Sequence, residues 1–332
     1  MKLENLCIFT LAASLSASFA ATAHADPPAP PVIDFARLQF RTERLAPRVY
    51  ALTGSPDVDP GHPDAAGGRI GVLTGPDGVL LVDATYHAAT GKAIAAIRAI
   101  TSAPVRYVIN THVHADHTGG NADFTEAGAL VFARQEVYDA MLVPLVPPPP
   151  PGVTGPAIPA RLPVVTYRLG QTVTLRLDDE IVDLIPIAAA HTAGDTMVRF
   201  EHADLLFVGD FFRSFGYPFI DTTNGGTLPG MLNALAAVVE LAGPHTRIIP
   251  GHGVIVERSA VAAQRDLILH VRARVAELIR DGKTLAEVIA ARPTAPYDAE
   301  VPGASATGAE RFVTELYTQL QGAAEPGGRA AR

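Results

Sequence analysis

Four side chains that can bind a metal ion fall within six residues of the sequence. They are His112, His114, Asp116 and His117, in the pattern His-x-His-x-Asp-His. Imidazole nitrogen and carboxylate oxygen both suit zinc. The spacing allows His112 and His114 to chelate one ion, while Asp116 and His117 face a neighbouring position. So many ligands in so short a stretch rarely arise on a surface by accident, and the stretch therefore predicts a metal site.

Three further candidate ligands lie downstream, each just after a short apolar run: His191, Asp210 and His252. Strands that each end in a turn bearing His or Asp would bring these side chains to one edge of the sheets. Asp210 is the best candidate for a carboxylate that reaches both metal positions. Two ions about 3.5–4 Å apart can share one hydroxide, whose pKa falls toward neutrality. We therefore predict a metal-bridging hydroxide as the nucleophile, which Asp116 orients before it carries a proton to the leaving group.

Five other histidines stand alone, outside any such motif. A single histidine in a loop is more often a solvated side chain than a metal ligand. We therefore expect solvated side chains at His62, His87, His202, His245 and His270.

The elements that must hold the ligands follow from the pattern of apolar residues. Residues 105–109 are β-branched and apolar, which predicts a buried strand directly before the histidine-rich stretch. A hairpin is expected at 69–83, a helix at 90–102, and a series of short strands between 164 and 208. Further helices are expected at 227–242, 259–280, 284–291 and 309–320. This order predicts two αβ halves joined back to back, with two sheets inside and helices outside.

Composition indicates a globular protein that does not bind nucleic acid. Of the 332 residues, 48% are hydrophobic and 18% are charged, which supports a sizeable core. The formal net charge is -8, and no cluster of Lys and Arg is present to neutralise phosphates. No Pro/Gly-rich linker separates two cores. We expect one domain over residues 37–322, followed by a flexible tail at 323–332.

The first 25 residues have the features of a secretory signal. Lys2 gives a positive start, an apolar stretch runs from 6 to 21, and small residues flank position 24. The apolar stretch is short for a membrane span. The single cysteine, Cys7, lies in this segment, so the mature chain would have neither a disulfide nor a thiolate ligand. We expect signal cleavage, an extended or mobile Pro-rich leader at 26–36, and a periplasmic or secreted bacterial protein without stable membrane insertion.

Proline dominates residues 144–163, with five consecutive prolines at 147–151. Such a segment can form neither a helix nor a central strand. We expect a stiff surface excursion, which either shapes the mouth of a substrate site or is only a solvated connector.

The ligand pattern resembles the signature of the metallo-β-lactamase superfamily over roughly residues 37–257. The resemblance implies an α+β fold, the four-layer αββα sandwich, in agreement with the order of elements above. It implies that Asp83 is a structural residue that supports the metal loop. It also implies two sets of metal ligands with Asp210 as the bridge: His112, His114 and His191 for the first ion, and Asp116, His117 and His252 for the second.

Asp210 separates this chain from β-lactamases proper, which have Cys or Ser at the corresponding place in their second site. Asp at this position resembles glyoxalase II, lactonases and related hydrolases, whereas the export signal suits a periplasmic β-lactamase. Residues 209–219 resemble exported superfamily members of unassigned substrate. They lie just past the bridging ligand, which makes Phe212, Arg213 and Tyr217 candidate substrate contacts. Core packing is the alternative for the two aromatic residues.

The leading prediction is a hydrolase with two Zn²⁺ ions that cleaves an ester, thioester, lactone or β-lactam bond of a small-molecule substrate. One alternative is a β-lactamase proper acting in the periplasm. Another is a non-haem iron oxidoreductase, because the same ligands can bind iron, although no flavin-binding domain is present. A further alternative is a metal-binding accessory protein without catalysis. The sequence makes no prediction of the oligomeric state.

Overall fold

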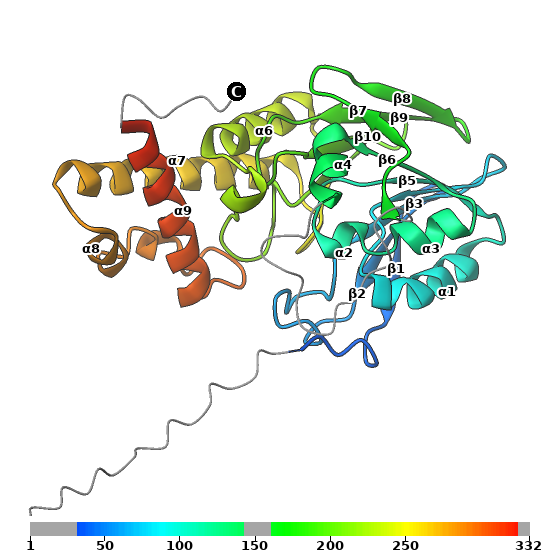
Figure 1. Ribbon diagram of the computed structural model, residues 1–332, viewed down its shortest axis with the longest axis horizontal. Coiled ribbons are helices and arrows are strands. Elements are labelled where there is room, and N and C mark those ends of the chain that lie inside the picture. Colours follow the sequence, from blue (N-terminus) through cyan, green and yellow to red (C-terminus); the bar gives the residue numbers. More distant parts are fainter. Residues whose placement is uncertain (1–31, 143–160, 325–332) are drawn as a thin grey trace, which may run out of the picture. The chain divides into compact units, whose positions relative to one another are not determined.

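The computed structural model describes residues 32–142 and 161–324. Within these ranges two β-sheets lie face to face, and helices cover the outer face of each sheet (Figure 1). This four-layer αββα arrangement confirms the predicted α+β sandwich.

The first sheet has seven strands in the order β1-β2-β3-β4-β5-β6-β7. The strands from β1 to β4 pair antiparallel, and those from β4 to β7 pair parallel. The antiparallel pair of β3 and β4 is the predicted hairpin. The bounds are β1 (Phe40–Ala46), β2 (Val49–Gly54), β3 (Ile70–Leu73), β4 (Val79–Val82), β5 (Val105–Ile109), β6 (Leu130–Arg134) and β7 (Val165–Tyr167).

The second sheet has five strands in the order β12-β11-β10-β9-β8. Its pairs are antiparallel except for β11 and β12, which run parallel and therefore end at the same edge. The bounds are β8 (Val173–Leu177), β9 (Glu180–Pro186), β10 (Thr196–Phe200), β11 (Leu205–Gly209) and β12 (Arg247–Pro250).

Helices occupy the two outer layers and the loops at the sheet edge. The α-helices are α1 (Thr90–Ile100), α2 (Ala115–Thr118), α3 (Asn121–Glu126), α4 (Gln135–Met141), α6 (Leu228–Leu241), α7 (Arg258–Arg280), α8 (Leu285–Ala290) and α9 (Ala306–Ala324). Short 3-10 turns are η1 (His87–Ala89), η2 (Thr222–Asn224) and η3 (Ala295–Tyr297).

The apolar core between the sheets explains why they pack face to face. Every residue of β4 and β11 is buried, which matches the unbroken apolar sequence of these strands. The inward side chains Leu80 and Val82 of β4 and Leu205 and Phe207 of β11 meet in one cluster with residues of neighbouring strands. Full burial of a side chain of this size contributes about 1.5–3 kcal/mol. The strand ends that carry the candidate ligands are therefore anchored in a packed core.

The outer layers follow from helices with one apolar face. Ala93 and Ile97 of α1 pack on the outer face of the first sheet. On the second sheet, α6, α7 and α9 contribute Leu235, Val271 and Phe312 to a separate core. Figure 1 shows these three helices together, apart from α1.

The end of the Pro-rich leader differs from the expectation of an extended or mobile segment. Ile33 is buried in a small apolar cluster, and Lys92 Nζ donates to the carbonyl oxygens of Phe35, Ala36 and Leu38 at 2.6–2.8 Å. These contacts hold residues 33–38 against the domain.

Several sequence predictions fall wholly or mostly on residues outside the described ranges. They are the signal at 1–25, most of the leader, most of the Pro-rich segment 144–163 and most of the tail 323–332. Among the described helices, none combines the length and the hydropathy needed to cross a bilayer.

Candidate metal centre

The predicted ligands stand at the ends of strands from both sheets. The histidine-rich motif follows β5, and Asp210 and His252 follow β11 and β12. His191 lies in the connection between β9 and β10. The structure brings the seven predicted ligands into three sets, and within each set the ligand atoms lie within 4.8 Å of one another. The sets are His112 with His114 and His191, His112 with His117 and Asp210, and Asp116 with His252 and a further histidine, His62. Strands packed in one core thus deliver residues far apart in sequence to a single site.

Three imidazole nitrogens converge in the first group. His114 Nδ1 lies 3.2 Å from His112 Nε2 and 3.1 Å from His191 Nε2. Nitrogens bound to one tetrahedral zinc at about 2.0–2.1 Å would be separated by roughly 3.3 Å. The spacing therefore fits a single metal ion held by the three histidines.

The outer partners of these rings assign the tautomer that a ligand needs. His114 Nε2 lies 2.7 Å from Asp221 Oδ2, and His191 Nδ1 lies 2.9 Å from the Phe219 carbonyl oxygen. Each outer nitrogen donates to an acceptor, so the inner nitrogen presents a lone pair. Three lone pairs directed at one another repel unless a cation lies between them. Asp221 and Phe219 were not identified from the sequence, because nothing local marks them as partners of the histidines.

The second group consists of Asp116, His117, Asp210 and His252. Asp116 Oδ2 lies 3.1 Å from His252 Nε2 and 3.3 Å from His117 Nε2. Asp210 reaches both rings, with Oδ1 3.6 Å from His117 Nε2 and Oδ2 3.4 Å from His252 Nε2. Within the described part of the chain, His117 Nε2 and Asp210 Oδ1 are buried without a hydrogen-bond partner. Buried polar atoms normally have partners, so this pair also fits a metal ion.

Burial and neighbouring charges set the protonation of the cluster. Burial lowers the pKa of His191 to about 3 and that of His252 to about 4, so both rings are neutral, as metal ligands must be. Burial opposes a charge on His117, but Asp116 and two further aspartates outweigh it and raise its pKa. Burial also opposes the charges of Asp116 and Asp210, yet nearby histidines dominate and hold the pKa of each carboxyl well below its usual range. The cluster therefore presents ionised carboxylates to a cation.

Asp83 holds the histidine-rich motif from the end of β4. Its carboxylate accepts hydrogen bonds from Thr111 N at 2.7 Å and from Thr111 Oγ1 at 2.8 Å. It also lies 2.7 Å from His117 Nδ1, which leaves Nε2 of that ring free for the cluster. Asp83 adopts φ +67°, a left-handed conformation that Asp tolerates better than most residues. These are the contacts of a residue that supports the metal loop.

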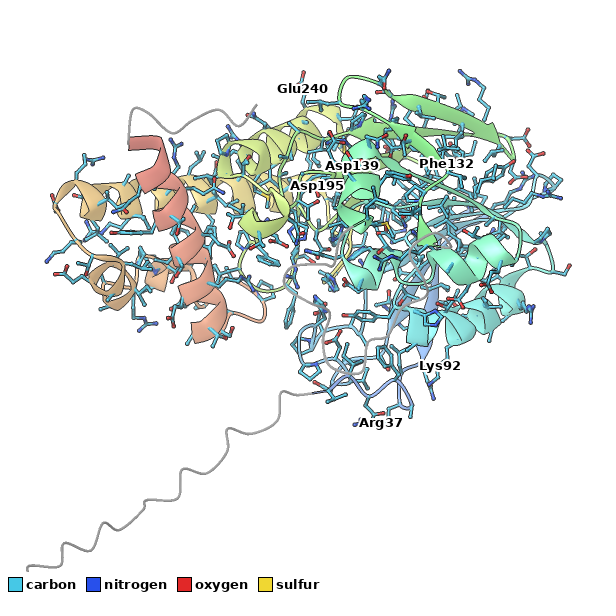
Figure 2. All side chains as sticks on the ribbon, viewed as in Figure 1. Arg37, Lys92, Phe132, Asp139, Asp195 and Glu240 are labelled. Carbon is cyan, nitrogen blue, oxygen red and sulfur yellow. The ribbon has the colours of Figure 1, made fainter. Side chains whose placement is uncertain are left out.

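Asp195 shapes the turn that carries His191 (Figure 2). Its carboxylate accepts from the backbone N–H groups of Ala190, His191 and Thr192 at 2.6–3.2 Å, and from Thr192 Oγ1 at 2.7 Å. Burial raises the pKa of Asp195 to about 6. Asp195 was not identified from the sequence, although a carboxylate four residues after a predicted ligand is a usable signal.

Two glycines leave room for the second group. A Cβ atom at Gly251 would lie 2.1 Å from Asp210 Oδ1 and 2.8 Å from His117 Cε1. A Cβ atom at Gly68 would lie 2.5 Å from His117 Cε1. Any larger residue at either position would displace a predicted ligand.

The structure corrects the expectation that His62 is a solvated residue. Its side chain is only 20% exposed, and its ring stacks on that of His252 with centroids 3.9 Å apart and planes 8° apart. Its Nδ1 lies 3.1 Å from Asp59 Oδ2, and its Nε2 lies 4.0 Å from Asp116 Oδ2. An imidazole binds metal in its ring plane, so two parallel stacked rings cannot bind the same ion in this arrangement. His62 therefore lies beside the cluster as a neighbour of His252, not as a further ligand.

Two of the three predicted substrate contacts belong to the core. Phe212 and Tyr217 are each 1% exposed and pack among the apolar residues of α6, α7 and α9. The Tyr217 hydroxyl donates to Asp298 Oδ1 at 2.5 Å, away from the cluster. Both aromatic side chains thus fit the alternative of core packing, and Phe212 also lines a pocket of about 300 Å³ beside Arg213 and Leu267.

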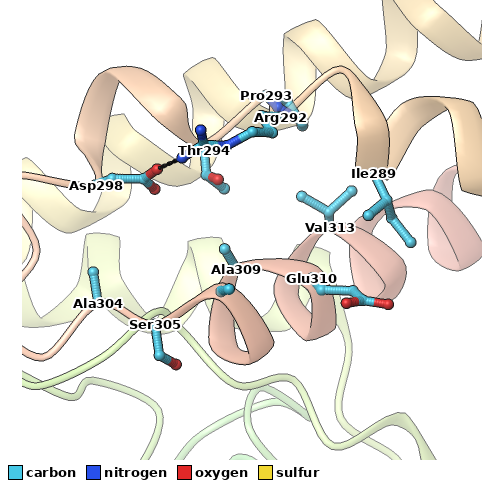
Figure 3. A pocket seen from close by; sticks show the side chains of 11 residues that line it. Ile289, Arg292, Pro293, Thr294, Asp298, Ala304, Ser305, Ala309, Glu310 and Val313 are labelled. Carbon is cyan, nitrogen blue, oxygen red and sulfur yellow. Dashed lines mark hydrogen bonds and ion pairs between the residues drawn. The ribbon is translucent and has the colours of Figure 1, made fainter.

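A pocket of about 330 Å³ lies between the segment after α8 and the start of α9 (Figure 3). The ion pair of Arg292 Nη2 and Asp298 Oδ2, at 2.6 Å, forms part of its wall. No candidate metal ligand lines this pocket. Its chemistry is therefore separate from that of the cluster.

The fold and the ligand cluster together define the family. The model of the metallo-beta-lactamase superfamily matches residues 64–252, a range that contains all seven candidate ligands. The chain belongs to this superfamily.

Known proteins similar to this chain include one relative by sequence and several by structure. A hydroxyacylglutathione hydrolase of Erythrobacter litoralis is 30% identical over 113 residues, which cover 34% of this chain and 36% of that protein. The metallo-beta-lactamase of Pontibacter korlensis superimposes with a TM-score of 0.57 at 18% identity, over 70% of this chain and 99% of that chain. A stereoselective inverting sec-alkylsulfatase from a Pseudomonas species gives a TM-score of 0.62 at 16% identity, over 84% of this chain and 50% of that chain. The two structures share the fold with this chain.

Proposed function

We propose that this chain is a hydrolase that uses two zinc ions to cleave an ester, thioester, lactone or β-lactam bond of a small-molecule substrate. The observation that carries the proposal is the convergence of three imidazole lone pairs next to a second group of buried, partnerless ligand atoms. His112, His114 and His191 would hold the first ion. Asp116, His117 and His252 would hold the second, with Asp210 shared between them.

The ions supply Lewis acidity, which polarises a carbonyl group and lowers the pKa of a water molecule. The chain itself supplies the groups that hold and move protons. Because the pKa of Asp116 is held well below its usual range despite burial, its carboxylate can accept a hydrogen bond from the attacking water. We propose that Asp116 then carries that proton to the leaving group.

Asp210 is the reason for proposing a substrate class that is broader than β-lactams. A carboxylate at this position is the feature that distinguishes the chain from β-lactamases proper. The hydroxyacylglutathione hydrolase that is similar to part of this chain, a hydrolase of acylated glutathione by its name, supports the inclusion of thioesters.

We also propose that Arg213 contacts an anionic group of the substrate. Arg213 is 8% exposed, and within the described ranges its guanidinium makes no hydrogen bond or ion pair. Its charge acts on both Asp210 and His252, so it lies near the cluster. A buried cation without a partner is costly, and an oxyanion on the substrate would offset that cost.

Metal analysis coupled to a substrate screen tests the proposed function. The purified chain should contain zinc and hydrolyse at least one member of a panel of β-lactams, lactones and thioesters, each class with a carboxylated and a neutral example. Asp210→Ala and His114→Ala should lose both metal and turnover. Arg213→Gln should lose activity mainly toward the carboxylated examples.

Two results would contradict the proposal. Full hydrolase activity after complete chelation would exclude a metal-dependent reaction. Iron in place of zinc, together with consumption of O₂, would favour a non-haem iron oxidoreductase of the same fold.

We further propose that the chain is exported to the bacterial periplasm or secreted. The support is the composition of its first 25 residues, with an apolar stretch and a small-x-small site. N-terminal sequencing of the protein recovered from the periplasmic fraction should begin near Asp26. Recovery of the uncleaved chain from the cytoplasm would argue against export.

A further inference from the structure

The segment Tyr217–Asp221, here called the strap, supplies the outer partners of two histidines in the first group. Phe219 O accepts from His191 Nδ1 at 2.9 Å, and Asp221 Oδ2 lies 2.7 Å from His114 Nε2. Asp221 N also donates to His191 O at 2.9 Å. The orientation of both rings therefore depends on where the strap lies.

The C-terminal helix α9 anchors the strap through the buried Glu315 and through Arg311, whose side chain is 40% exposed. Glu315 Oε2 accepts from Ile220 N at 3.0 Å. Arg311 Nη2 donates to the carbonyl oxygens of Tyr217 and Pro218 at 3.2 and 3.4 Å, and its Cζ lies 4.6 Å above the centre of the Phe219 ring. Arg311 Nε also lies 3.3 Å from Glu315 Oε1. One helix thus contacts four consecutive residues of the strap.

The position of α9 is itself well determined. Phe312, Val313 and Leu316 are buried in the core that α9 shares with α6 and α7. Arg311 and Glu315 are separated by one helical turn, so the helix presents them side by side. The family model ends at residue 252, and α9 lies beyond that match.

An ion pair with one partly exposed and one buried partner is a weak source of stability, because solvent screens the attraction and desolvation of the buried charge offsets it. Stability alone therefore does not account for placing Arg311 and Glu315 under the strap. Outer partners of metal-binding histidines, in contrast, typically change metal affinity by about 10–100-fold when they are removed.

We propose that Arg311 and Glu315 are positioning residues for the first metal position, acting through the strap on His114 and His191. The inference rests on the proposed function, in which these histidines hold a metal ion. Asp221 contacts His114 directly, and α9 holds the strap where this contact can form. The C-terminal helix thereby contributes to metal binding at the first position.

The test is a measurement of zinc affinity that requires no turnover. Metal-free full-length protein competes with a chromophoric chelator for Zn²⁺, which yields two stepwise dissociation constants. Glu315→Ala should weaken the binding of one zinc ion about 10–100-fold and leave the other within about twofold. Glu315→Gln should restore affinity, because its amide oxygen can still accept from Ile220 N. The control is Glu310→Gln, an exposed residue of the same helix, which should match the wild type.

Asp221→Ala identifies which zinc ion is affected. It should weaken the binding of the same ion. The double variant with Glu315→Ala should lose less affinity than the sum of the two single losses, since both act through the strap. If circular dichroism shows that Glu315→Ala does not fold, Arg311→Met takes its place and must show the same selective loss.

The outcomes separate this inference from the proposed function. A wild-type chain that binds no zinc would overturn both. A wild-type chain that binds two zinc ions, with Glu315→Ala weakening neither or weakening both equally, would overturn only the positioning role of α9.

Discussion

His114, His117 and His191 each depend on a second residue that decides which ring nitrogen faces the cluster. Asp83 fixes His117 and Asp221 fixes His114, in both cases through a contact of 2.7 Å. A neutral imidazole has one donor and one acceptor nitrogen, so a carboxylate on the outer nitrogen prepares the inner nitrogen to bind metal. The ligands are thus preorganised by the protein before any ion arrives.

The cluster leaves little free space for further side chains, and a substitution at Gly251 tests this. In Gly251→Ala the new Cβ atom would lie 2.1 Å from Asp210 Oδ1, so the bridging carboxylate must shift. We expect the loss of at least one bound metal ion per chain. We also expect the rate of hydrolysis to fall tenfold or more, on the order of the loss of activity when an outer partner of a metal ligand is removed. The metal-to-protein ratio after dialysis measures the effect.

The matched control is Gly91→Ala in α1, where an added Cβ atom meets nothing within 4 Å. This variant should keep its metal and gain slightly in stability, because alanine favours a helix by about 1 kcal/mol over glycine. Wild-type metal content and activity in Gly251→Ala would show that Asp210 need not occupy its observed position.

At the scale of elements, the connection between β11 and α6 has two tasks. It carries Asp210 at its start and the strap in its middle, while Phe212 and Tyr217 tie it into the core. A loop with two such anchors can hold ligands as firmly as a strand does. This arrangement places an acidic side chain of α9 in a buried position, because Glu315 is 8% exposed.

Glu315 should make stability depend on pH in a defined direction. Burial raises its pKa to about 7 from the usual 4.5. A carboxyl group that binds its proton more tightly in the folded state than in the unfolded state stabilises the fold, and this contribution is complete at low pH. That contribution is lost as pH rises between about 4.5 and 7.

Glu315→Gln isolates this effect, because glutamine does not titrate and its oxygen can still accept from Ile220 N. Denaturant unfolding at pH 5 and pH 8 gives the free energy of unfolding of both proteins. The value for wild type minus that for Glu315→Gln should fall by on the order of 2 kcal/mol between the two pH values. A difference that stays constant with pH would mean that Glu315 titrates normally.

At the scale of the whole molecule, the cluster joins the two sheets. One set of ligands follows β5 of the first sheet, and His191, Asp210 and His252 extend from the second. The same residues bring ionised carboxylates and imidazole nitrogens from both sheets close together, so a bound cation would link the two sheets. Metal should therefore contribute to folding as well as to catalysis.

Removal of metal should lower the thermal midpoint of the full chain. An ion held at a thousandfold excess over its dissociation constant stabilises the folded state by about 4 kcal/mol. A domain of this size shifts by roughly 2–4 °C per kcal/mol, so complete chelation should lower the midpoint by on the order of 10 °C. Scanning calorimetry before and after chelation, with readdition of Zn²⁺, measures the shift.

A double variant, His112→Ala with His191→Ala, provides the comparison. It should respond to chelation less than the wild type, because the first metal position is already lost. An unchanged midpoint in fully chelated wild type would mean that metal does not link the two sheets energetically.

The sequence by itself determined the features that depend on near neighbours. Apolar periodicity predicted the two sheets and their covering helices, since each element must bury one face. The seven candidate ligands could be recognised because His112 to His117 are contiguous and the others each follow an apolar strand directly.

Only the tertiary structure decided the features that depend on distant neighbours. His62 looked isolated, yet a loop folds it onto His252. Asp221 carries no local mark of its role and meets His114 across 107 positions of sequence. Phe212 and Tyr217 follow a predicted ligand closely but turn into the core. Spacing along the chain shows which residues can share a strand or turn, whereas packing decides which side chains meet.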